Sequence, residues 1–145
     1  MNQCKNLREG FLRNRASFGF ETVASTEEKV EFAKKAVDNG YGLDFIYVTV
    51  KNPDICLERI ETRVARGGHN VDPDKVRKRY WKSLEFLHRY IELAENVSIY
   101  DNSGFGMKLI FSKKNGICVL LVNPKNCNWV SEHILAHIKG VVHSY

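Results

Sequence analysis

Three arginines, Arg59, Arg63 and Arg66, are the side chains of this sequence best suited to bind an anion. Their i, i+4 and i+7 spacing places the three guanidinium groups on one face if the segment is helical. Gly67 and Gly68 follow directly, where a helix can end and the backbone can hinge. Because guanidinium groups match pairs of phosphate oxygens, and a mobile loop can close over a ligand, we predict a phosphate-binding lid.

Charge in the surrounding segment favours this interpretation. The formal net charge is +5, and residues 51–89 hold ten Lys or Arg against six Asp or Glu, a local charge of +4. A local positive field attracts a polyanion such as a nucleotide, a sugar phosphate or a nucleic acid. Glu58 and Glu61 lie between the arginines, however, so a solvated, salt-bridged helix face is an open alternative.

The bulk composition is that of one globular domain spanning residues 1–145. Hydrophobic residues make up 43% of the 145 positions, which is enough for a modest core. We find no apolar stretch long enough to span a bilayer and no secretory signal, and therefore expect a cytoplasmic protein without membrane association. The four cysteines show no C-x-x-C spacing, so neither a zinc knuckle nor a disulfide framework is indicated.

Helix and strand patterns alternate along the first two thirds of the chain. In order, we expect a helix at residues 5–15, a strand at 17–23, a helix at 26–39, a strand at 43–50, helices that open at Pro53 and Pro73, and a strand at 97–100. This alternation predicts an α/β fold, a parallel sheet with helices on both faces. The nearly continuous apolar run of residues 43–50 predicts a central strand buried on both faces.

The last third of the chain has a different pattern. Asn115-Gly116 between two β-branched, apolar segments is a strong hairpin signal, which pairs residues 107–111 with 117–122. An amphipathic pattern then predicts a closing helix over residues 128–139. We therefore expect a core over residues 1–104 and a hairpin–helix extension over residues 105–145.

Ligands of parallel α/β sheets bind beyond the carboxyl ends of the strands. Glu21-Thr22 at the end of the first predicted strand, and Lys51-Asn52 after the second, would face that crevice. The arginine helix follows directly.

Three segments resemble the zeta-toxin-like P-loop kinases when taken together. They are Phe20-Glu21-Thr22, residues 58–69 with their Arg-Gly-Gly-His end, and residues 100–104, Tyr-Asp-Asn-Ser-Gly. Their order and spacing are similar to those of the bacterial branch described as predicted ABC-type ATPases, over roughly residues 8–104. The resemblance implies a P-loop kinase fold with ATP and Mg²⁺ as cofactors, and phosphorylation of a UDP-activated amino sugar within a toxin–antitoxin pair.

The resemblance also implies roles for individual residues. Glu21, with Thr22, matches the position that holds the acceptor substrate, and Arg59 matches a lid arginine that contacts nucleotide phosphates. Arg66 or His69 falls near a second lid arginine, and Asn102 and Ser103 match the turn beside the nucleotide base. A water-facing glutamate and a plain surface turn are the open alternatives for Glu21 and for Asn102-Ser103.

One departure from the family is severe. The G-x-x-x-x-G-K-[ST] signature, whose backbone N–H groups and lysine hold the β- and γ-phosphates, does not occur in the sequence. The family's catalytic aspartate has no counterpart either. We therefore expect an N-terminally truncated kinase that is inactive alone, or a non-catalytic subunit completed by a partner that supplies the P-loop. A missing central strand would also expose a sheet edge and promote self-association.

Two further possibilities concern nucleic acids and metals. A nucleic-acid-binding module would use the basic, aromatic-containing helix of residues 75–90, where Lys and Arg alternate with Tyr80 and Trp81. Helical spacing places both aromatic side chains among leucines, which favours a core role instead. We predict no metal site, because His133 and His137 form an i, i+4 pair without a third ligand.

Overall fold

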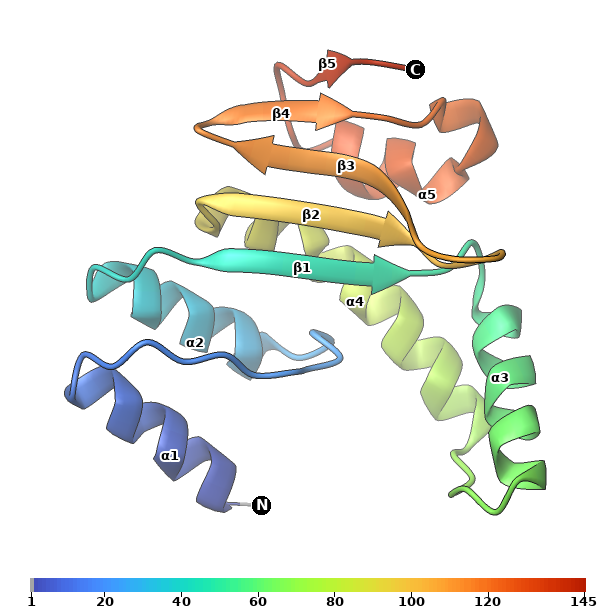
Figure 1. Ribbon diagram of the computed structural model, residues 1–145, viewed down its shortest axis with the longest axis horizontal. Helices are drawn as coiled ribbons and strands as arrows, with labels where there is room; N and C mark the ends of the chain where they lie inside the picture. The colour runs from blue at the N-terminus through green and yellow to red at the C-terminus, as the bar shows by residue number, and fades with distance from the viewer. Residues whose placement is uncertain (1) are drawn as a thin grey trace.

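The computed structural model describes residues 2–145 and shows a mixed α/β protein built on one five-stranded sheet (Figure 1). In spatial order the strands are β1 (Asp44–Thr49), β2 (Asn96–Asp101), β3 (Lys108–Lys114), β4 (Ile117–Leu120) and β5 (Val142–His143). The β1–β2 and β4–β5 pairs are parallel, whereas β2–β3 and β3–β4 are antiparallel. The expected parallel sheet is met in part: β1 and β2 form a parallel pair, but the β3–β4 hairpin joins the same sheet and makes it mixed. Strands β1, β2 and β4 nevertheless run in one direction and end on the same side of the molecule.

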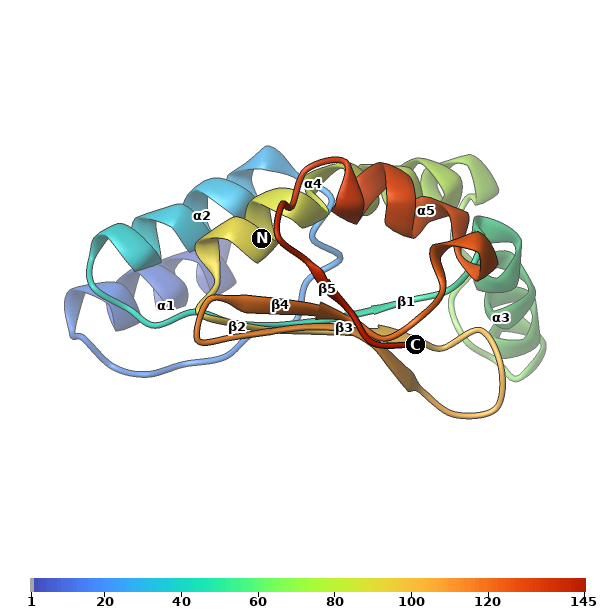
Figure 2. The same cartoon turned by 90° about the horizontal axis from the view of Figure 1, so that it is seen from above.

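The helices gather on one face of that sheet. They are α1 (Asn2–Arg13), α2 (Glu27–Asp38), α3 (Pro53–Ala65), α4 (Pro73–Leu93), a 3-10 turn (Pro124–Asn126), and α5 (Asn128–Val130), which continues as a π-helical turn (Ser131–Leu135). Figure 2 shows α2, α4 and α5 above the sheet, and α3 beyond the carboxyl ends of the strands. None of the helices within residues 2–145 is both long and apolar enough to cross a membrane.

The opposite face of the sheet is bare, so the expectation of helices on both faces is not met within residues 2–145 (Figure 2). Along β1, Tyr47 and Thr49 point into the core, whereas Ile46 is 71% and Val48 is 47% exposed. β1 also lies at the border of the sheet rather than at its centre. A run of apolar residues does not distinguish a strand buried on both faces from one that exposes apolar side chains.

Residues 17–23 do not form the expected strand. Phe18 stacks on Phe11 of α1 at a ring separation of 5.3 Å, and both Phe18 and Phe20 contact Phe32 of α2. The aromatic side chains that suggested a strand therefore pack between two helices. β-propensity reports a preference for a half-buried apolar surface, and here helices provide that surface instead of a sheet.

The local start and stop signals are confirmed. The Asn52 side chain accepts hydrogen bonds from the backbone N–H groups of Asp54 and Ile55, and Asp72 accepts one from Lys75. The hairpin turn has positive φ at Asn115 (51°) and Gly116 (77°), as a tight two-residue connection requires. The closing helix ends at Leu135, earlier than expected.

One continuous core joins the two parts of the chain. The α4 residues Leu84, Leu87 and Ile91 pack in the same buried cluster as Phe111 of β3 and Ile134 of the C-terminal helix. Residues 105–145 thus complete the core between the sheet and the helices that cover one face of it, and they carry side chains to the end where β1 and β2 finish.

Candidate anion-binding site

The turns that follow β1 and β2 are tied together. The backbone N–H of Lys51 donates to Ser103 Oγ at 2.8 Å, and the backbone N–H of Asn102 donates to the Thr49 carbonyl oxygen at 2.8 Å. Asp101 Oδ1 accepts hydrogen bonds from both the backbone N–H and the hydroxyl of Ser103. These bonds hold two polar turns side by side at the carboxyl end of the sheet, where ligands of α/β proteins bind.

Arg59 joins this end of the sheet from α3. Its Nη2 donates to the Asn102 carbonyl oxygen at 2.6 Å. The Asn52 cap and the buried Pro53 set where α3 begins, and the arginine lies two turns further along the helix. The structure therefore brings together Arg59 and Asn102, two residues that the sequence assigned to nucleotide binding.

Arg63 has a different partner. Its Nη2 donates to the His69 carbonyl oxygen at 3.0 Å. Gly68 N donates to the Arg63 carbonyl oxygen and Gly67 N to that of Val64, both at 2.9 Å, which is a Schellman motif. Gly67 has a φ of +87°, which favours glycine. The predicted helix end is confirmed, and the guanidinium of Arg63 braces the loop.

The guanidinium groups of the three arginines therefore do not converge on one common binding position. Arg59 reaches the turn after β2, Arg63 reaches its own loop, and Arg66 is the exposed C-cap residue of α3. Arg66 forms no hydrogen bond or ion pair through its side chain in the part of the chain that the structure describes. Of these three arginines, Arg59 alone is hydrogen-bonded to the turns at the strand ends within residues 2–145.

Glu21 and Thr22 are not brought to this cluster by a strand, because residues 17–23 lie outside the sheet. Thr22 Oγ1 accepts a hydrogen bond from the Ala24 N–H at 3.2 Å, and both side chains are exposed. Among residues 2–145, no hydrogen bond or ion pair links either residue to Arg59 or Asn102. Their role in substrate binding stays a prediction.

A hollow of about 300 Å³ opens beside the same turns. It is lined by Lys51, Lys125, Asn126, Cys127, Asn128 and Trp129. Burial raises the pKa of the Cys127 thiol to about 11, with Asp101 adding to the rise and Lys51 opposing it, so the thiol stays protonated at neutral pH. Sequence patterns did not single out Lys125 as a site residue. The predicted hairpin was the feature that could have indicated its position. Because the hairpin makes β4 run parallel to β1, the residues after β4 lie at the same end of the sheet as Lys51.

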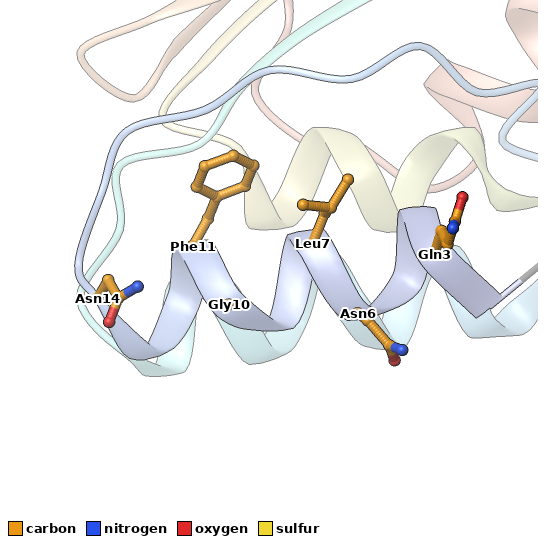
Figure 3. A pocket seen from close by; sticks show the side chains of 6 residues that line it. All are labelled: Gln3, Asn6, Leu7, Gly10, Phe11 and Asn14. Atoms are coloured by element: carbon orange, nitrogen blue, oxygen red, sulfur yellow. The ribbon is translucent and has the colours of Figure 1, made fainter.

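A larger hollow of about 560 Å³ lies along α1 (Figure 3). Leu7 and Phe11 point to the same side of the helix, and the lining residues also include Gln3, Asn6 and Asn14. The lining residues carry no titratable side chain, so this hollow offers no acid, base or charged ligand for chemistry.

Two histidines from distant parts of the sequence, His88 and His137, stack on one another, which the sequence did not indicate. His137 stacks on His88 of α4 with ring centroids 4.1 Å apart. Burial is the main cause that lowers the pKa values of both His88 and His133, and each is lowered further by His137. In the described part of the chain, no three His, Cys, Asp or Glu side chains are placed to hold a metal ion.

Several side chains of the basic helix α4 already have partners within the protein and are not free to bind a nucleic acid. Tyr80 is buried and donates its hydroxyl to the Val50 carbonyl oxygen at 2.8 Å, so it is not available to stack on a base. Arg77 pairs with Asp54 at 2.7 Å, and Lys82 pairs with Glu85. Trp81 remains 46% exposed.

The comparisons with known proteins assign neither a family nor an activity. No protein-family model matches the chain, and no solved structure matches it. A protein of Haemophilus influenzae described as uncharacterized is 30% identical over 69 residues, which are 48% of this chain and 49% of that protein. The chain thus spans about half the length of the curated relative that it matches.

Proposed function

We propose that this chain binds a phosphate-bearing ligand, a nucleotide or UDP-linked sugar, at the carboxyl ends of β1 and β2. The observation that carries the proposal is the position of Arg59, whose guanidinium is held by the Asn102 carbonyl oxygen at 2.6 Å beside Lys51. A guanidinium has five N–H donors, so the bond to Asn102 orients the group and leaves donors for phosphate oxygens.

Phosphoryl transfer from Mg²⁺-ATP does not fit the residues of this chain. The turn after β1 passes from Lys51-Asn52 straight into Pro53 and has no glycine-rich loop to cradle phosphates. In the turn after β2, the Ser103 hydroxyl is engaged with Asp101. We therefore propose that this chain alone binds the phosphate-bearing ligand and does not transfer a phosphoryl group.

The resemblance to zeta-toxin-like kinases would add a UDP-activated amino sugar as acceptor and an antitoxin as partner. It also motivates the proposal that a partner supplies the P-loop. β1 and β2 are paired directly in parallel, so a partner's strand would add at the outer side of β1. Within residues 2–145, no strand pairs with that side.

The test is calorimetric titration with UDP, a UDP-linked amino sugar, ADP and ATP. We expect saturable binding of at least one of them and a loss of about tenfold or more for Arg59→Gln, since a hydrogen bond to a charged group contributes roughly 1.5–3 kcal/mol. Arg13→Gln, which removes an exposed positive charge on α1, is the matched control. No binding at millimolar ligand, or equal affinities for the two variants, would refute the proposal.

Nucleic-acid binding by α4 is the alternative proposal. The exposed Trp81 would stack on bases while Lys75, Lys78 and Arg79, which form no ion pairs among residues 2–145, contact phosphates. Binding of a single-stranded oligonucleotide that weakens steeply with salt and is lost in Trp81→Ala would support it.

A further inference from the structure

The hollow beside Lys51 is built by two segments that are far apart in the sequence. Lys51 follows β1, and Lys125 to Trp129 follow β4, at the end where both parallel strands finish. Its volume of about 300 Å³ lies at the lower limit of ligand pockets, which run from roughly 300 to 1,000 Å³. It therefore suits a small ligand or one group of a larger ligand.

Two positive charges line this hollow, and its lining residues include no carboxylate. Neither Lys51 nor Lys125 forms a salt bridge within residues 2–145. Asp101 is the carboxylate near Cys127, and its Oδ1 already accepts two hydrogen bonds from Ser103. Two ammonium groups on one hollow repel one another, and an anion bound between them would add two attractive interactions that outweigh this repulsion.

The wall of the hollow also contains an unsatisfied donor. Trp129 is 4% exposed, and its Nε1 is buried with no hydrogen-bond partner among the described residues. An indole N–H can only donate, and leaving such a group unpaired inside a protein is costly. The Nε1 atom is closed off from the open space of the hollow, so a ligand oxygen reaches it only after the indole ring shifts.

We propose that this hollow is a binding site for a tetrahedral phosphate group, held by Lys51 and Lys125 against a wall that Trp129 forms. The asparagine amides of Asn126 and Asn128 supply further donors to the group's oxygens. The site lies outside residues 8–104, apart from the contribution of Lys51. It does not require Arg59, so it goes beyond the function proposed above.

The chain provides its own probe of this site. It has two tryptophans, Trp81 and Trp129, so a Trp81→Phe variant leaves Trp129 as the one tryptophan to be excited selectively, on the wall of the hollow. Titration of this variant with inorganic phosphate, pyrophosphate or a nucleoside monophosphate, at constant ionic strength set with chloride, should give a saturable change in emission. The response to free phosphate, compared with that to the monophosphate, shows which source of the group binds better.

The matched variants are Lys125→Ala and Lys114→Ala, both in the Trp81→Phe background. Each removes one exposed lysine, but Lys114 lies at the far end of the β3–β4 hairpin. We expect Lys125→Ala to weaken phosphate binding by about tenfold or more, and Lys114→Ala to leave it within about twofold, as for an ordinary surface charge. Equal effects of the two variants, or the same emission change with chloride alone, would overturn the proposal.

Arg59→Gln in the same assay separates this inference from the proposed function. If the hollow is an independent site, phosphate binding persists in Arg59→Gln even where nucleotide binding is lost. If the chain binds nucleotides but phosphate does not change the emission of Trp129, the proposed function stands and the proposed phosphate site in the hollow is refuted.

Discussion

Arg59 Nη2 lies 2.6 Å from the carbonyl oxygen of Asn102 and donates to it, which fastens the helix after β1 to the turn after β2. The side chain is exposed, so water replaces the bond when the arginine is removed. We expect Arg59→Met to lower the free energy of unfolding by less than about 1 kcal/mol, while it lowers affinity for a phosphate ligand about tenfold. Urea denaturation and calorimetry on the same variant check the two effects. A large loss of stability would show that the arginine is structural instead.

The loop after α3 depends on two glycines for different reasons. Gly67→Ala places a side chain at a φ of +87°, which costs roughly 1–2 kcal/mol. Gly68→Ala would put its Cβ 2.6 Å from Arg63 Cγ and 2.9 Å from the Arg63 carbonyl oxygen, so we expect a larger loss and a disordered loop. Gly10→Ala is the control: a Cβ there meets nothing within 4 Å, and helix propensity favours alanine by roughly 1 kcal/mol. Urea denaturation midpoints should therefore shift in opposite directions.

Tyr80 anchors α4 to the end of β1. Its hydroxyl donates to the Val50 carbonyl oxygen at 2.8 Å in a buried site. Tyr80→Phe leaves that carbonyl with only the longer hydrogen bond from Thr49 Oγ1, at 3.4 Å, and we expect a destabilisation of about 1–3 kcal/mol. In Tyr47→Phe the remaining Ser83 hydroxyl still donates to the Tyr80 carbonyl oxygen, so a smaller loss is expected. Equal losses would contradict this assignment. Thermal unfolding of both variants measures the difference.

The histidine cluster predicts a pH dependence of stability. His88 and His133 have folded-state pKa values below 6.5, mainly through burial, so the unfolded chain binds protons more readily. The contribution of the two neutral histidines to the free energy of unfolding is fully present above pH 6.5. It is lost as the pH falls through their lowered folded-state pKa values. Glu85, Glu92 and Glu132 oppose the effect, and Arg89 and His137 reinforce it.

Urea denaturation between pH 7.5 and 5.5 tests this dependence above the range where carboxylates titrate. His88→Gln should flatten the slope, whereas His69→Gln, at an exposed loop position, should leave it unchanged. A stability that is constant over this range would show that the cluster does not titrate on unfolding.

The free edge of β1, with its exposed apolar side chains, predicts self-association. Ile46 and Val48 are exposed on β1, whose outer side pairs with no other strand within residues 2–145, and apolar strands of this kind pair with other chains. Val48→Lys should shift the protein towards the monomer in sedimentation experiments at increasing concentration. Ile117→Lys, at an exposed position on β4 near the hairpin turn, is the matched control. A wild-type protein that stays monomeric at high concentration would disprove the prediction.

The features that the sequence predicted correctly depend on bonds between near neighbours. Asn52 and Asp72 cap helices two or three residues further on, Gly67 ends α3 through bonds that span five residues, and Asn115-Gly116 turns a hairpin. Such interactions need no distant partner, so residue type and spacing are enough to predict them. Arg59 and Asn102, which the family resemblance linked, do lie in contact at the strand ends, and their role in binding stays a prediction.

Contacts between distant segments decided the rest. Phe18 and Phe20 pack between α1 and α2 rather than in the sheet, and β1 leaves one face bare, because each apolar side chain takes whichever partner the whole chain provides. The pairing of β3 with β2 brings Lys125 beside Lys51, and the packing of the C-terminal helix on α4 sets His137 against His88. These pairs are separated by dozens of residues, and no local pattern of residues encodes which of the possible distant partners a side chain will meet.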